Sequence, residues 1–188
     1  GLPSQREAGT LGRSELALAL HGSVASQYVN ESNANELLNL DGETLRFALE
    51  LRYGLAQDWD LQLEVPWLEQ SGGDLDSAID NWHDFWGMSD GGRSSVPRDV
   101  LDYRYLSADG QFSLQDDTSG IGDISLALSH AFYRDKDSVL SVALGYKAGT
   151  GDEDDFLGSG ADDVYVALRD AFDDMHLVWP AIGATAAV

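Results

Sequence analysis

Charged residues at alternating positions are the first candidates in this sequence for a functional site. They lie on the polar sides of two segments joined by a short turn: Arg46, Glu50, Arg52, Asp60 and Glu64. If both segments are strands, the five charges face one interior. Rings of charge select ions in a pore, whereas a mutually paired network fills a narrow barrel. We favour the paired network, and the pore lining stays open.

An acidic run is the second candidate: Asp152, Glu153, Asp154 and Asp155, with Asp162 and Asp163 nearby. Ca²⁺ and Mg²⁺ prefer oxygen ligands, and a bound cation could bridge to lipopolysaccharide phosphates. The spacing differs from an EF-hand loop, in which ligands alternate with spacers and a glutamate ends the loop. We therefore favour a solvated loop without a cofactor, with calcium or magnesium as the weaker alternative.

The segment 74–87 is predicted to be a short amphipathic helix, because its large apolar residues recur at helical spacing. Trp82, His83 and Asp84 on this helix could form a metal or acid–base site, but no second histidine has ligand spacing. We favour a structural role, in which the helix packs over a barrel mouth. A lid or constriction at that mouth is the functional alternative.

Motifs of enzymes are absent from the sequence: there is no Gly-x-Ser-x-Gly, no Walker loop and no dinucleotide fingerprint. A serine hydrolase would need a serine and a histidine within hydrogen-bond reach. His21 and His130 lie near several serines, but His130 shares the register of Leu126 and Leu128. We expect no catalytic residues, and an outer-membrane hydrolase is kept as a second alternative.

The elements that carry these residues show a period of two. Apolar residues alternate with polar or small ones in six segments: 16–21, 45–53, 59–67, 124–132, 140–147 and 163–169. Strict alternation predicts strands with one apolar and one polar face. A further strand is expected over 177–188, and a small hairpin over 103–106 and 111–115.

Tight and long connections alternate along the chain. The tight ones are 54–58, 135–137 and 173–174; the long polar ones are 30–41, 68–101 and 150–162. Transmembrane barrels have short periplasmic turns and long outer loops, so the sequence predicts an antiparallel up-and-down transmembrane β-barrel. The helix over 74–87 would be an insertion in one extracellular loop.

Composition agrees with one domain over residues 1–188. The chain has 188 residues, no cysteine and a formal net charge of -22, which disfavours nucleic acid as a partner. Hydrophobic residues make up 43%, too many for a disordered acidic chain. About seven spanning strands are expected, whereas single-chain barrels have an even number. We therefore expect a barrel that is incomplete at its C-terminal end or closed by another chain, which leaves a homo-oligomer open.

Several short segments, in this order and spacing, resemble the DUF3187 family of uncharacterised proteobacterial proteins. They are Leu40-Asp41-Gly42-Glu43-Thr44, Arg52-Tyr53-Gly54-Leu55, Glu64-Val65-Pro66, Ser71-Gly72-Gly73-Asp74-Leu75-Asp76, Trp82-His83-Asp84, Gly91-Gly92-Arg93 and Gly120-Ile121-Gly122-Asp123. The resemblance runs from Gly1 to about Asp174. It implies a barrel in the Gram-negative outer membrane and offers no activity or site residues. Members of the family are longer at the C-terminus.

Two functions from different classes follow. The first is a passive, porin-like channel or a structural envelope protein, with outer-membrane lipid and lipopolysaccharide as partners. The second is a soluble β-barrel or sandwich that binds an apolar ligand. The first requires the leucines to face outward and the charges inward, and the second requires the opposite.

Overall fold

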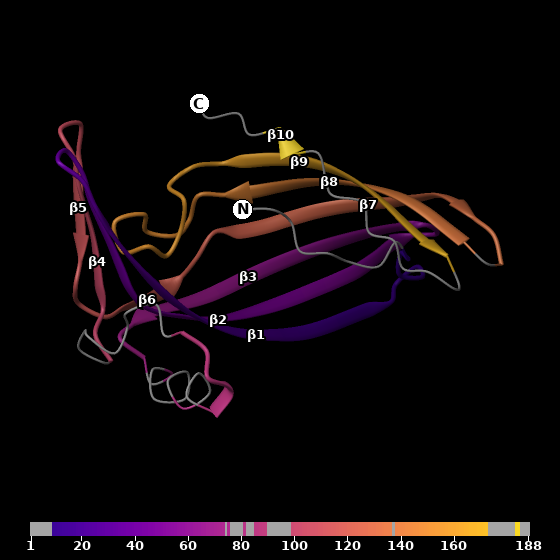
Figure 1. Ribbon diagram of the computed structural model, residues 1–188. Coiled ribbons are helices and arrows are strands. Elements are labelled where there is room, and N and C mark those ends of the chain that lie inside the picture. Colours follow the sequence, from indigo (N-terminus) through magenta and orange to yellow (C-terminus); the bar gives the residue numbers. More distant parts are fainter. Residues whose placement is uncertain are drawn as a thin grey trace.

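The computed structural model describes residues 9–73, 75, 81, 85–89, 99–136, 138–172 and 183–184. These residues form one antiparallel sheet of ten strands (Figure 1). The strands are β1 (Leu16–Ser32), β2 (Leu37–Ala56), β3 (Trp59–Ser71), β4 (Asp102–Leu106), β5 (Gln111–Leu114), β6 (Thr118–Ile121), β7 (Ile124–Arg134), β8 (Ser138–Ala148), β9 (Asp163–Phe172) and β10 (Gly183–Ala184). The predicted all-β, antiparallel fold is therefore confirmed.

Seven strands form the main wall, in the order β1-β2-β3-β7-β8-β9-β10. One edge of β2 pairs with β3 and then, over Leu37–Asp41, with β4. In the same way β3 pairs with β7 and, over Trp67–Gln70, with β6. Strands β4, β5 and β6 therefore lengthen the sheet away from the turns that join β2 to β3 and β7 to β8. We call that turn-bearing end the short-turn end, and the opposite end the long-loop end.

The alternation of the sequence is carried across the sheet by the strand register. Leu51 pairs with Leu63, which pairs in turn with Leu126. The neighbouring row joins Arg52 to Gln62. Because adjacent residues point to opposite faces, matched rows gather the apolar side chains on one face and the polar and small ones on the other.

The two faces of the sheet differ in exposure. In a soluble protein the apolar face of a sheet is usually buried, but here the apolar face is exposed and the polar face is buried. On the apolar face, Leu18 is 65%, Leu144 is 54% and Leu168 is 60% exposed. On the other face, Asp60 is 1% exposed and Ala143 is fully buried. The sheet is curved (Figure 1), and curvature brings together the side chains on the concave side. We call this concave, polar side the inner face.

A small apolar cluster stands at the long-loop end. Tyr103 and Leu114 from the β4–β5 hairpin are buried with Leu101, and Leu40 and Phe156 pack against them. The Phe156 ring also lies 5.5 Å from the Tyr103 ring. This cluster joins the loop after β8 to the extension of β2, so the long-loop end has its own packing.

Most predicted strands are confirmed, and one loop prediction is wrong. The hairpin expected at 103–106 and 111–115 is present as β4 and β5. Most of the long loop expected over 30–41 is instead strand, because β1 and β2 stay paired to Ser32 and Leu37, and only residues 33–36 connect them. Its polar residues are used in the sheet: the Asn39 side chain accepts a hydrogen bond from Asn30 and donates one to Asp102, at 2.9 and 2.8 Å.

Two predictions fall largely outside the described residues. Of the segment 74–87 only residues 75, 81 and 85–87 are described, with helical backbone at Asn81, Phe85 and Trp86. Of 177–188 only β10 is described. No helix in the described part of the chain is long and apolar enough to cross a membrane. Across the same residues the main wall is open, with β1 and β10 at its edges.

Candidate functional site

The five charged residues singled out in the sequence all lie on the inner face, where β2 and β3 pair. The turn at Gln57–Asp58, with Asp58 at φ 62°, aligns the two strands. The Arg46 guanidinium lies 2.6 Å from a Glu64 carboxylate oxygen, and that of Arg52 lies 2.5 Å from Asp60. Both are charge-assisted hydrogen bonds, which are stronger than neutral ones.

The fifth residue, Glu50, stands directly opposite Glu64 in the register. Two carboxylates at such a position repel each other. Each has a basic neighbour, since Arg46 contacts Glu64 and the His21 Nε2 of β1 lies 3.3 Å from Glu50. The acids and bases of β1, β2 and β3 therefore form one interdigitated cluster.

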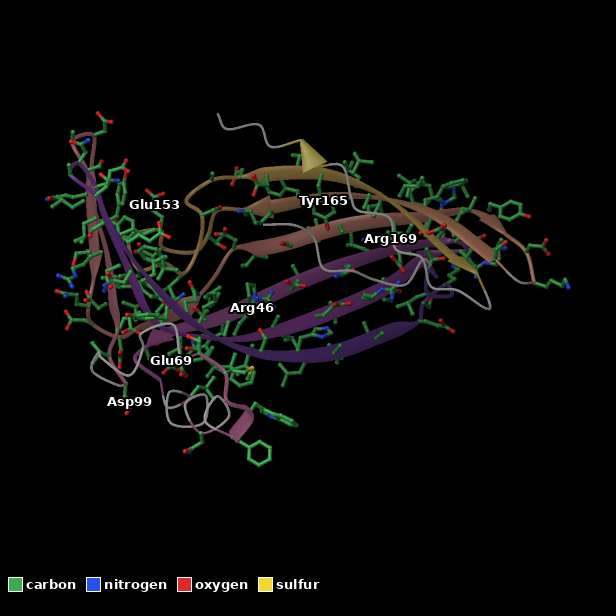
Figure 2. The ribbon with its side chains drawn as sticks, viewed as in Figure 1. Arg46, Glu69, Asp99, Glu153, Tyr165 and Arg169 are labelled. Atoms are coloured by element: carbon green, nitrogen blue, oxygen red, sulfur yellow. The ribbon has the colours of Figure 1, made fainter. Side chains whose placement is uncertain are left out.

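The opposite wall of the inner face is built mainly from small residues. Ser129, Ser141 and Ala143 of β7 and β8 are almost fully buried. Larger side chains come from β9: Tyr165 and Arg169 point into the same concavity as Arg46 (Figure 2). A Cβ at Gly145 would overlap the Tyr165 ring, so this glycine leaves the space that the ring occupies. The inner face thus has a charged wall and a small-residue wall.

A second charged centre lies at the long-loop end, on Asp123 between β6 and β7. Its carboxylate accepts hydrogen bonds from Lys147 Nζ at 2.8 Å, Gly151 N at 3.0 Å and Ser159 N at 2.9 Å. Lys147 also contacts Asp163 at 2.9 Å. Partial burial alone would raise the pKa of Asp123, but these hydrogen bonds outweigh burial and lower its pKa. Asp123 therefore anchors the 149–162 loop as an ionised carboxylate.

Replacing Asp123 by asparagine is expected to release this loop, because the amide cannot accept all three hydrogen bonds as an anion does. A protease that cuts after acidic residues should cleave 152–155 several-fold faster than in the parent. Asp116→Asn, an exposed acid outside this loop, is the matched control and should not change the rate of cleavage at 152–155. Equal cleavage of both variants would contradict this role.

The pH dependence of this anchor follows from the direction in which the pKa of Asp123 is shifted. The pKa of Asp123 is lowered from 3.8, so its stabilisation is complete at neutral pH and is lost as the pH falls below 3.8. The amide resonances of Gly151 and Ser159 should shift together in that acidic range. In Asp123→Asn the same resonances should show no such joint transition.

The other predicted sites are the acidic run 152–155, residues Trp82, His83 and Asp84 of the predicted helix, and His130. The Asp152 carboxylate accepts the Asp154 and Asp155 amides at 3.0 and 3.4 Å, which shapes the turn. No group of three or more acidic or histidine residues in the described ranges is placed to hold a metal ion, so the cation site stays a prediction. Trp82, His83 and Asp84 lie outside the described residues. His130 stacks on Trp59 at 4.1 Å on the apolar face.

Sequence reasoning missed Asp123, Lys147, Tyr165 and Arg169. Three of them could have been found from the alternation of the sequence, because Lys147, Tyr165 and Arg169 occupy polar positions of two predicted strands. Asp123 carried no such signal, since it lies between strands and gains its partners from β8 and from the loop that follows β8.

The fold and the site define an all-β protein whose single antiparallel sheet turns charged residues inward and apolar residues outward. This chain belongs to the DUF3187 family, described as a protein of unknown function, which matches residues 1–177. None of the curated proteins and none of the solved structures matches it.

Proposed function

We propose that this chain forms the wall of an outer-membrane β-barrel, and that its inner face lines a passive path for small solutes. One observation carries the proposal: leucines of β1, β2, β7, β8 and β9 are exposed on one face, while Arg46, Arg52 and Asp60 lie on the other. Water would penalise such a face, whereas lipid accepts it. Barrel strands alternate apolar-out and polar-in for this reason.

The length of the apolar face supports the same proposal. Trp59 and Trp67 of β3 lie on it near its two ends, eight residues apart. At about 3.4 Å per residue, they are about 27 Å apart along the strand. A strand tilt of about 35–45° reduces this to about 19–22 Å along a membrane normal, close to the ~25 Å apolar band of such barrels. Aromatic residues at both limits match interfacial girdles.

The arrangement of charges favours a passive role. Arg46 and Arg52 are bound to acids of the neighbouring strand rather than aimed at one point. Paired charges of both signs provide a polar surface for water and small ions without strong preference for either sign. In the purely structural alternative, the same pairs fill the barrel and no path remains.

The membrane proposal also makes a demand on β1. Among the described strands, all 17 residues of β1 pair with β2, along one of the two edges of β1. In lipid every backbone group must be hydrogen-bonded, so the other edge must be paired as well. We propose that a strand running antiparallel to β1 closes the barrel there.

The deciding experiment compares refolding with and without detergent micelles. We expect a β-rich circular dichroism spectrum and a heat-modifiable gel band only in detergent, followed by conductance in planar bilayers. Heat-modifiable protein without conductance would favour the alternative of a structural envelope protein. A monodisperse, β-rich protein in plain buffer would overturn the membrane proposal and favour the soluble ligand-binding alternative.

A further inference from the structure

We propose that residues 9–14, here called the N-terminal strap, close the short-turn end of the inner face and act as a displaceable plug. The inference rests on the proposed function, because a plug has meaning only if the inner face is a path. It is carried by the hydrogen bonds of the strap and by the glycine on which the strap lies.

The strap turns back onto the sheet just before β1. Ser14 N donates to Gly54 O at 2.8 Å, and Gly54 N donates to Glu15 O at 2.9 Å. Ser14 has a φ of 65°, which reverses the chain direction at this point. The Glu15 carboxylate accepts the Gly12 amide at 2.7 Å and holds the reversed segment in place.

The reversed segment lies on the inner face rather than on the apolar one. Gly54 pairs with Asp60 in the register, so both point inward. A Cβ at Gly54 would overlap the Gly12 carbonyl oxygen, so the strap rests directly on the backbone of β2. Glycine is the residue that permits this close approach.

Charged side chains of the inner face hold the strap down. Arg52 donates to Gly9 O at 2.9 Å, and Leu11 N donates to Asp60 Oδ2 at 3.0 Å. Asp60 is 1% exposed. Its Oδ1 has no hydrogen-bond partner within the part of the chain that the structure describes. The strap and the Arg52–Asp60 pair therefore form one unit.

A third contact reaches a more distant strand. Arg134, at the end of β7, donates to Thr10 Oγ1 at 3.2 Å and to Asp58 at 3.2 Å. The strap thus touches β2, β3 and β7, which adjoin in the sheet. Because side chains supply most of these bonds, the strap can leave without breaking the pairing of the sheet.

The test uses a single cysteine at Ser129, since the chain has no native cysteine. Ser129 is 3% exposed and pairs with Asp60 beside the strap. We expect slow labelling of Ser129→Cys by a water-soluble maleimide. Leu11→Pro removes the amide that donates to Asp60 and should speed labelling at least tenfold. Leu11→Ala keeps that amide and should not.

Gly54→Ala is an independent second variant, because its methyl group displaces the strap without altering a charge. It should also speed labelling at least tenfold, and Gly22→Ala, which adds a methyl near the movable Phe47 ring, is its control. Circular dichroism checks that each variant retains its strands. If folded Leu11→Pro or Gly54→Ala is labelled at an unchanged rate, the proposal that the strap closes the inner face is wrong.

Conductance separates this inference from the proposed function. If both hold, Leu11→Pro conducts more than Leu11→Ala in planar bilayers. Fast labelling without any conductance would keep the strap as a structural cover but refute its role as a plug and the channel. Conductance with equal labelling would keep the channel and refute the strap.

Discussion

Leu144→Arg is expected to prevent stable insertion of this chain into micelles or bilayers. Leu144 lies near the middle of β8 on the apolar face and is 54% exposed. In water, such an exposed substitution changes stability little. In a membrane, arginine facing lipid near the midplane costs about 2–4 kcal/mol. The fraction of heat-modifiable protein after refolding into lipid vesicles measures the difference.

Leu106→Arg is the matched control. Leu106 is 51% exposed, almost the same as Leu144, but it lies on β4 at the long-loop end, beyond the Trp67 limit of the apolar band. It should refold like the parent protein. If Leu144→Arg and Leu106→Arg refold equally well, the apolar face does not meet lipid.

Replacing Arg52 by methionine should produce the largest loss of stability among changes on the inner face. The substitution leaves the Asp60 carboxylate buried without its cation. Breaking a buried pair from one side costs about 3–5 kcal/mol, because a charge remains uncompensated. Urea unfolding of the refolded protein, followed by tryptophan fluorescence, gives this difference as a shift of the midpoint.

Arg46→Met provides the comparison, since Arg46 and Glu64 are more exposed, at 34% and 14% for their side chains. Its loss should be clearly smaller than that of Arg52→Met, because the Glu64 carboxylate is less deeply buried than that of Asp60. The double variant Arg52→Met with Asp60→Leu should recover most of the loss, because no charge is left unpaired. Equal losses for the two single variants would show that Asp60 is not buried in solution.

Local pattern was enough to predict the strands, because the alternation of the sequence matches the geometry of a pleated strand. Segments such as 45–53 and 59–67 carry an uninterrupted period of two, so their two faces could be assigned before any pairing was known. The same assignment placed Arg46 and Glu64 on one side. The prediction failed at 30–41, where polar residues indicated a loop but paired strands continue.

Partners far apart along the chain could not be predicted in this way. The Asp123 anchor joins a residue between two strands to a lysine and a loop that follow it by many positions. The strap joins Leu11 to Asp60 and Thr10 to Arg134. Neither contact leaves a periodic pattern, because each depends on which strands adjoin and on how the sheet curves.

The sequence by itself determined that this protein is an antiparallel sheet with one apolar and one charged face, since side-chain alternation is a local property of the strand. Only the tertiary structure decided which face is concave. Curvature and strand order bury Asp60 and expose Leu144, and they bring Arg52 and Arg134 to the same short-turn end. These are properties of the whole sheet, because they depend on every strand being paired in register.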